Sequence, residues 1–356
     1  MGGTVIDAQK NIYLTANFNV MKFSPDGRVL WVYDFKRHCG PKEMALFTMN
    51  APSLWGDAVF GNTESGQVFA IRADTGDEIW TKQILWHWIG PEATNNGFVQ
   101  ASDGVVVVDT LLTVHALDAK NGDKLWEFSP DKPVWNFLAS FPGDGTVVFQ
   151  DWEGRVYRLR LSDGGLIWKA GGLPGTWTDG SLIVGSNGLV YAVNCFGFMG
   201  IKKADFPGSM GAVTAYSLSD GRLVWRTEVP MAPNNMPAVG RLGEGPKLSV
   251  VQPIGNQAVK GETFSVLALD AETGEQQWIF RGPTQVGWIQ AAADLTESQS
   301  AQIQANCVPN PWSAPTIDAL GTVYIASQEG PIFSLRDANG DGEVAGAGEV
   351  DSYQTW

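Results

Sequence analysis

Short apolar runs separated by turn-forming residues fill this chain. Residues 105–109 and 114–118 form one pair of runs, and residues 322–327 and 331–335 form another. β-Branched and aromatic side chains dominate the runs, and Gly, Asp and Asn cluster between them, which is typical of strands joined by tight turns. The pattern predicts an all-β protein built from many short antiparallel strands.

One tryptophan recurs at a fixed place in this pattern, four residues after a glycine that follows Asp, Thr or Asn. The six tryptophans are Trp31, Trp80, Trp126, Trp168, Trp225 and Trp278. They are separated by 42 to 57 residues, a period in the range of propeller blades. We expect each glycine to take a positive φ in a hairpin between the third and fourth strands. Each tryptophan then begins an outer strand, where its ring can pack between adjacent blades.

The repeat also predicts how many blades there are. First strands are expected near Gly3, Ser53, Gly97, Phe137, Ser181, Pro237 and Ala314. We therefore predict a single domain over residues 1–356, a seven-bladed β-propeller of four-stranded antiparallel blades. The last unit has Val344 where the tryptophan is expected. An eight-bladed propeller is the alternative if residues are missing from the chain.

The pattern Ala-x-Asp-x-x-Thr-Gly-x-x-x-Trp, close at residues 116–126 and 268–278, resembles the tryptophan-docking motif of the PQQ-like repeat β-propeller family. This quinoprotein dehydrogenase-like superfamily includes the bacterial outer-membrane assembly scaffold. The resemblance covers nearly the whole chain. It implies a propeller, but one propeller fold hosts enzymes, scaffolds and binding modules alike.

Charge and composition exclude several classes of partner. The chain has 24 basic and 38 acidic residues, a net charge of −14 that repels phosphate backbones and anionic lipid surfaces. No apolar stretch is long enough for a membrane helix. Nucleic acid partners and a membrane span are thus not expected. The first residues do not resemble a targeting signal. We expect an exported protein, periplasmic, extracellular or in an organelle lumen, whose targeting signal is absent from this chain.

Amide and indole side chains recur in the segments that link each outer strand to the next inner strand. Such segments converge on one face of a propeller, around the mouth of its channel. The candidates for ligand binding there are Trp86, His87, Trp88, Asn96, Trp135, Asn136, Trp177, Asp179, Asn235 and Trp312. They could bind a flat or polar ligand by stacking and hydrogen bonding. Alternatively, they start strands and cap loops by binding the backbone.

The resemblance implies that the quinone cofactor of the related enzymes sits at this same rim. Their hallmark of two adjacent cysteines is missing, because Cys39, Cys195 and Cys307 have no cysteine neighbour. PQQ is therefore not favoured, although it is not excluded, and no catalytic residue is predicted. If the chain is an enzyme, an aspartate such as Asp179 would be the general base. His115 is expected inside a strand with a structural role.

A candidate metal loop lies in the last unit. Asp337, Asn339 and Asp341 occupy positions 1, 3 and 5 of a calcium-loop pattern, and the carbonyl of Glu343 occupies position 7. Position 12 is glycine, so Glu349 is the candidate substitute for the usual glutamate. The same residues are also common in hairpin turns that bind no metal.

Two insertions interrupt the repeat, at residues 195–210 and 282–313. In the first we expect exposed apolar side chains at Phe196, Phe198, Met199 and Phe206, which a partner protein would bury. The sequence thus predicts a non-catalytic propeller that acts as a protein-interaction scaffold or ligand-binding module. The alternative is a PQQ- and calcium-dependent quinoprotein dehydrogenase acting on alcohols or sugars. A third possibility is polysaccharide binding by exposed tryptophans.

Overall fold

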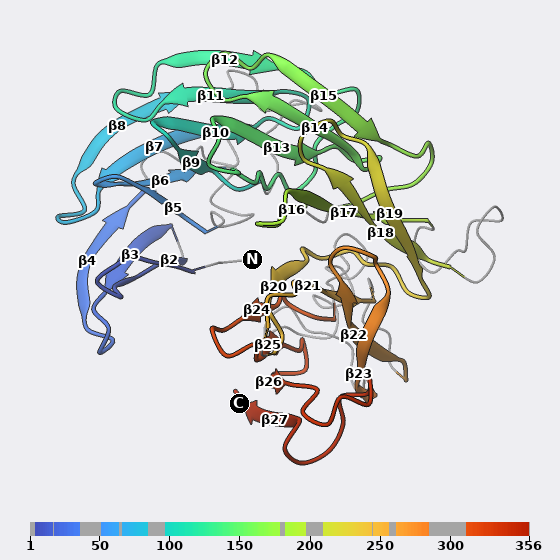
Figure 1. The fold of residues 1–356 in the computed structure, drawn as a ribbon. Helices are drawn as coiled ribbons and strands as arrows, with labels where there is room; N and C mark the ends of the chain where they lie inside the picture. Colours follow the sequence, from blue (N-terminus) through green and yellow to red (C-terminus); the bar gives the residue numbers. More distant parts are fainter. Residues whose placement is uncertain are drawn as a thin grey trace. The chain divides into compact units, whose positions relative to one another are not determined.

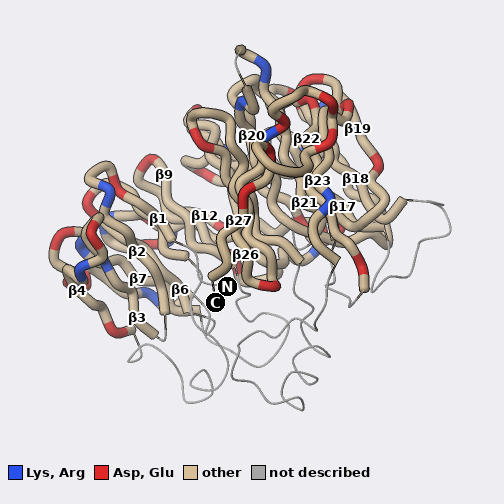
Figure 2. Tube along the Cα trace, turned by 90° about the horizontal axis from the view of Figure 1, so that it is seen from below, with Lys and Arg blue, Asp and Glu red and all other residues tan. Residues whose placement is uncertain are grey.

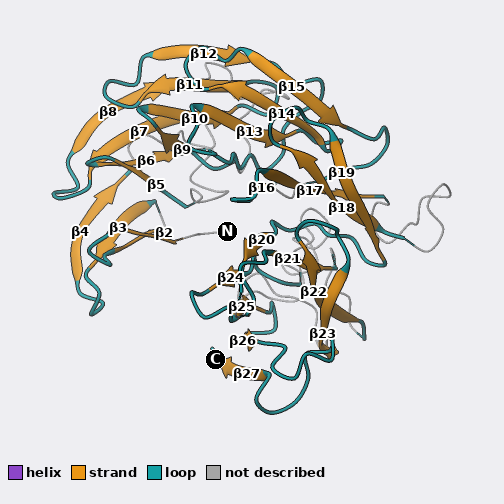
Figure 3. Ribbon diagram, viewed as in Figure 1, coloured by secondary structure: helices purple, strands orange, loops and turns teal. Residues whose placement is uncertain are grey.

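The regular structure of this chain consists of strands. The computed structural model describes residues 4–16, 18–35, 51–63, 66–84, 97–178, 182–196, 209–243, 245–255, 261–284 and 311–355. Within these ranges every regular element is a strand (Figure 3), and no helix could cross a membrane. The strands form seven antiparallel sheets that follow one another along the chain (Figure 1). The prediction of an all-β chain with the seven blades of a β-propeller is confirmed.

Each sheet is an antiparallel meander. The first two contain β1 (Thr4–Ile6), β2 (Ile12–Ala16), β3 (Asn19–Phe23), β4 (Val29–Asp34), β5 (Ser53–Trp55), β6 (Ala58–Asn62), β7 (Gln67–Arg72) and β8 (Glu78–Gln83). The next two contain β9 (Gln100–Ser102), β10 (Val105–Asp109), β11 (Val114–Asp118), β12 (Lys124–Phe128), β13 (Thr146–Gln150), β14 (Arg155–Arg160) and β15 (Leu166–Gly171). The fourth sheet has three strands, and an isolated bridge between Ser140 and Val148 stands in place of its first strand.

The last three sheets complete the chain. They contain β16 (Ile183–Val184), β17 (Leu189–Cys195), β18 (Gly211–Ser217), β19 (Leu223–Val229), β20 (Ala238–Gly240), β21 (Ser249–Ile254), β22 (Thr263–Asp270), β23 (Gln276–Thr284), β24 (Thr316–Ile317), β25 (Val323–Ala326), β26 (Pro331–Leu335) and β27 (Val350–Gln354). The chain divides into two compact units, residues 1–152 with 157–169 and residues 153–156 with 170–356. The first unit holds the first four sheets, apart from the start of β14 and the end of β15, and the second holds the last three.

Indole rings connect successive sheets within each unit. An indole Nε1–H donates to a main-chain carbonyl of the next sheet in four pairs: Trp31 to Ala73 (3.1 Å), Trp80 to Ala119 (3.0 Å), Trp126 to Leu161 (2.7 Å) and Trp225 to Ala271 (3.0 Å). Each of these rings also lies on the hairpin glycine of that next sheet. At Gly122, with φ of 72°, an added Cβ would lie 2.6 Å from the Trp80 ring. Glycine is therefore required there both for its backbone conformation and for the space the ring takes.

A β-bulge precedes the tryptophan in five sheets, a feature that the sequence analysis did not identify. In the third sheet Ala116 pairs with Trp126 while Leu117 pairs with Lys124, so Leu125 is the extra residue. The same shift occurs in the sheets of Trp31, Trp80, Trp225 and Trp278. A bulge increases the local twist of a strand, and in four of these five sheets the tryptophan ring lies on the hairpin glycine of the next sheet.

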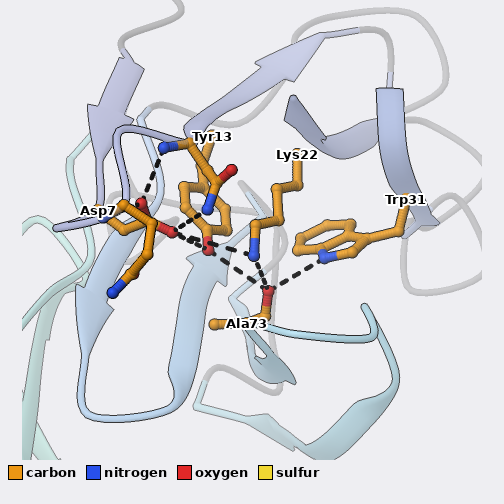
Figure 4. A network of polar contacts seen from close by, with 7 residues as sticks. Asp7, Tyr13, Lys22, Trp31 and Ala73 are labelled. Carbon is orange, nitrogen blue, oxygen red and sulfur yellow. Dashed lines mark hydrogen bonds and ion pairs between the residues drawn. The ribbon is translucent and has the colours of Figure 1, made fainter. Parts of the chain in front are cut away.

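Figure 4 shows how polar groups surround one of these contacts. The Ala73 carbonyl accepts hydrogen bonds from both Trp31 Nε1 and the buried Lys22 Nζ, the latter at 2.9 Å. Beside them Tyr13 Oη donates to Asp7 Oδ2 at 3.0 Å. Partial burial acts to raise the pKa of Asp7, but hydrogen bonds led by those from Asn11 hold that pKa below its usual value. The first two sheets are thus joined by a paired polar cluster as well as by apolar packing.

The last hairpin joins its neighbouring sheet by main-chain pairing. Ile279 N donates to Gly342 O at 3.0 Å, and Val344 N donates to Ile279 O at 2.9 Å. The Val344 side chain is buried in the same apolar cluster as Trp278. This pairing explains how the last unit can carry valine where the other units carry tryptophan.

Candidate functional site

The structure describes about half of the predicted channel-mouth residues. Trp86, His87, Trp88, Asn96 and Asp179 lie outside the described residues. Trp135 and Asn136 belong to the first unit, whereas Trp177, Asn235 and Trp312 belong to the second.

In the second unit the predicted Asn235, together with Gln252, which was not predicted, holds the chain's own loops. Asn235 Nδ2 donates to the Trp312 carbonyl at 2.7 Å, and its Oδ1 accepts from Met236 N at 2.8 Å. Gln252 Nε2 donates to the carbonyls of Asn235 (3.0 Å) and Pro253 (2.8 Å). The Trp312 ring is buried. The Asn235 side chain is thus engaged within the protein, whereas the buried Gln252 Oε1 and Trp312 Nε1 have no hydrogen-bond partner among the described residues.

Trp177 is also buried. Its main chain forms a two-way bridge with Cys195, with N to O distances of 3.1 and 2.8 Å. The Cys195 Sγ lies 3.8 Å from the Oδ1 of the buried Asn234. The ring of Trp177 therefore offers little surface for stacking a ligand.

Trp135 differs from these residues because 42% of its surface is exposed. It lies in the connection between β12 and β13, which is fixed at both sides. Before Trp135, Val134 N donates to Leu111 O at 2.6 Å and Trp152 N donates to Pro133 O at 2.7 Å. After it, Phe98 N donates to Phe137 O at 2.7 Å. The Trp152 ring meets the Trp135 ring edge-on, with centroids 5.6 Å apart and planes at 75°. The first unit thus presents an indole on a well-anchored loop.

A pocket of about 470 Å³ lies against the same connection. Its lining includes Thr110, Thr113, His115, Ser129, Asp131 and Pro133. His115 Nε2 lies 3.1 Å from Thr110 Oγ1, whose hydroxyl donates to Thr113 O at 3.2 Å. Burial lowers the pKa of His115. A second pocket of about 390 Å³ lies beside the same histidine.

Asp109, at the end of β10, is a buried carboxyl that the sequence analysis did not single out. Its Oδ2 accepts from Leu111 N at 3.2 Å, and its Oδ1 has no hydrogen-bond partner. Gly97 leaves the space that this oxygen occupies, since a Cβ there would collide with it. Burial raises the pKa of Asp109 to about 7. The sequence signal for this buried carboxyl was an acidic residue at the end of an otherwise apolar run, residues 105–109.

The predicted calcium loop is closed by a carboxylate of the chain itself. Glu349 is buried, its Oε1 accepts from the N–H groups of Ala338 and Asn339, and its Oε2 accepts from Ala345 N, each at 3.1 Å. Asp337 and Asp341 likewise accept main-chain N–H groups, and Glu343 pairs with Arg281. Among the described residues, no three His, Cys, Asp or Glu side chains are grouped to hold a metal. The residues as placed do not form a ready cation site, and calcium binding stays a prediction.

The first predicted partner loop is described only at its edges. Phe196 was expected to be exposed, and this is wrong, because only 1% of its surface is accessible. The Arg226 guanidinium lies over its ring at 5.0 Å and covers it. Phe198, Met199 and Phe206 lie outside the described residues, as do residues 285–310 of the second loop.

The seven sheets and the recurring indole contacts define a PQQ-like repeat β-propeller. A PQQ-repeat family model, described as outer membrane protein assembly factor BamB, matches residues 16–197 and 171–342. The chain belongs to this family.

Individual relatives include both scaffolds and enzymes. Outer membrane protein assembly factor BamB of Moranella endobia (strain PCIT) is 28% identical over 190 residues, which are 48% of this chain and 47% of that protein. Quinohemoprotein alcohol dehydrogenase ADH IIB of Pseudomonas putida is 26% identical over 187 residues, which are 50% of this chain and 25% of that protein. The chain matches about half the length, or less, of these curated relatives.

Solved structures share the fold across nearly the whole chain. BamB from Moraxella catarrhalis has a TM-score of 0.65 at 16% identity and covers 99% of this chain and 87% of its own. The quinohemoprotein alcohol dehydrogenase ADHIIG from Pseudomonas putida HK5 has a TM-score of 0.66 at 11% identity. It covers 99% of this chain and 66% of its own. At these identities the likeness concerns fold alone.

Proposed function

We propose that this chain is a non-catalytic propeller scaffold that binds other polypeptides during outer-membrane protein assembly, as an exported protein. The proposal draws on the family match and on the relatives whose name is outer membrane protein assembly factor. The observation that carries it is that the predicted ligand-binding side chains described in the second unit are buried or hydrogen-bonded to the chain itself. The Asn235 side chain binds main-chain groups of the chain itself, and the rings of Trp177 and Trp312 are buried.

The overall charge is consistent with a protein partner. Figure 2 shows basic residues scattered among acidic ones along the described strands and turns. A net charge of −14 disfavours nucleic acid and anionic lipid. We propose the loops 195–210 and 282–313 as the contact surface, because both are long insertions in the repeat and the first contains Phe198, Met199 and Phe206.

The test measures binding to an unfolded outer-membrane β-barrel polypeptide. Diluting that polypeptide from urea into buffer with the purified chain should suppress its aggregation and give a complex on size exclusion. Replacing Phe198, Met199 and Phe206 together by serine should weaken the complex about tenfold, since each apolar side chain contributes through its buried area. Leu125→Ser, on the exposed side of β12, is the control and should bind normally. Absence of a complex, or equal binding by the triple variant, would contradict the proposal.

A quinoprotein dehydrogenase is the second candidate, favoured by the relatives that are quinohemoprotein alcohol dehydrogenases. Against it, the sequence lacks adjacent cysteines. Purified chain should be incubated with PQQ and calcium, followed by absorbance spectra and dye reduction over an alcohol and sugar panel. We expect neither binding nor turnover. Stoichiometric PQQ binding with substrate-dependent dye reduction would instead establish the enzyme.

A further inference from the structure

We propose that the connection between β12 and β13, with the pocket beside it, forms a binding site for a neutral saccharide. The site lies wholly within the first unit and is independent of the scaffold function. Its parts are the exposed Trp135 ring, the Trp152 ring behind it and the pocket of about 470 Å³ that Pro133 borders.

The indole supplies a pre-ordered stacking surface. A hydrogen bond from Val134 N to Leu111 O fixes the connection before Trp135, and one from Phe98 N to Phe137 O fixes it after Trp135. Asp131 N donates to Tyr157 Oη at 2.8 Å and fixes it at a third point. A rigid aromatic ring loses little conformational entropy on binding. The electron-rich face of an indole attracts the C–H edge of a sugar ring.

The pocket supplies groups that recognise hydroxyls. The side chains of Thr113, Ser129 and Asp131 line it, and they offer two hydroxyls and a carboxylate. Its volume of about 470 Å³ is within the range of small-ligand sites. A saccharide has both the apolar ring face that the indole favours and the hydroxyls that this lining can bind.

The local charges favour an uncharged ligand. Asp131 is paired with Lys169, with Nζ to carboxylate distances of 2.7 and 2.9 Å. In the neighbouring pocket Lys82 pairs with Asp123, and Lys124 pairs with Glu127, each at 2.9 Å. The charges within each pair neutralise one another, so a charged ligand would gain little from them. Lys132 is a further charged residue of the pocket lining.

The test titrates chitotriose, maltotriose and cellotriose into the purified chain, with calorimetry and tryptophan fluorescence as readouts. We expect at least one trisaccharide to bind with a Kd in the millimolar range or below. Trp135→Ala should weaken that binding about tenfold, and Ser129→Ala severalfold. Trp55→Ala is the matched control, because Trp55 is 41% exposed in the same unit but lies in β5, away from the pocket.

A second measurement covers the case in which Trp135→Ala unfolds. In the wild-type chain the NMR signal of the Trp135 indole N–H, assigned with Trp135→Phe, should shift on titration while that of Trp55 stays still. The proposal fails if none of the three sugars binds, or if Trp135→Ala folds and binds equally. It also fails if an unfolded polypeptide, and no sugar, shifts the Trp135 signal.

Discussion

Asp109 illustrates how one side chain can set a pH response. Its carboxyl is fully buried and only Oδ2 is hydrogen-bonded. Burial raises its pKa to about 7 from an ordinary value of 3.8. The folded state therefore holds a proton that the unfolded state releases at lower pH. This contribution to stability is complete below pH of about 4 and is lost as the pH rises through 7.

We predict that Asp109→Asn flattens the decline in stability between pH 5 and pH 8. The whole shift corresponds to roughly 4 kcal/mol at most, of which roughly 3 kcal/mol falls between pH 5 and pH 8. Urea unfolding at both pH values would measure it. Asp103→Asn, at an exposed turn of the same sheet, should keep the wild-type slope. An unchanged slope in Asp109→Asn would show that the carboxyl does not titrate in this range.

Hairpins and bulges set the contacts between neighbouring elements. In each described pair, an indole from one sheet lies on the hairpin glycine of the next. Gly122 has both a positive φ and the Trp80 ring against it, whereas Gly27 has a positive φ and nothing within 4 Å. Comparing substitutions at these two glycines therefore distinguishes the cost of backbone strain from the cost of a collision with the ring.

We predict that Gly122→Ala destabilises the chain more than Gly27→Ala. The backbone strain at positive φ should cost about 1 kcal/mol at either site. The collision with the Trp80 ring should add about 1–3 kcal/mol at Gly122 alone. Chemical denaturation of both variants would measure the difference. Equal losses would mean that the ring moves aside freely.

The last hairpin depends on Glu349, whose carboxylate accepts three main-chain N–H groups. Glu349→Gln should lower the free energy of unfolding by about 1–3 kcal/mol, because an amide accepts these bonds less strongly. Glu343→Gln removes only an exposed ion pair with Arg281 and should cost under about 1 kcal/mol. Hydrogen exchange at Ala338 and Asn339 should quicken in the first variant only. Equal exchange in both would disprove the role of Glu349.

The calcium prediction can be tested on the same proteins. If the loop binds calcium, the melting temperature should fall by several degrees when a chelator replaces calcium, since a ligand stabilises the state it binds. Asp341→Asn should reduce that difference. An unchanged melting temperature in the wild-type chain would remove the calcium site.

At the scale of the whole molecule, acidic self-repulsion opposes folding. The net charge is −14, and excess charge of one sign destabilises a compact state. Raising sodium chloride from about 20 to 500 mM should therefore increase the melting temperature, because salt shortens the range of repulsion. Potassium chloride should act equally if screening is the cause. A fall in melting temperature with either salt would contradict this account.

Local pattern was sufficient to predict the strands and the number of blades. The predicted starts near Ser53, Ser181, Pro237 and Ala314 lie within two residues of observed first strands. Alternating apolar residues and Gly-containing turns act over a few neighbouring positions, so one sequence contains them. The bulges were missed because the repeat spacing is the same with or without an extra unpaired residue.

The sequence by itself determined the repeat, the strand content, the net charge and the lack of a cysteine pair. Only the tertiary structure decided which of the predicted side chains are available. The Asn235 side chain donates to the main-chain carbonyl of Trp312, which is 77 residues away in the sequence. The Phe196 ring is covered by Arg226, and Trp135 is exposed. Burial and hydrogen-bond partners arise from segments that are distant in the chain, and no local pattern specifies them.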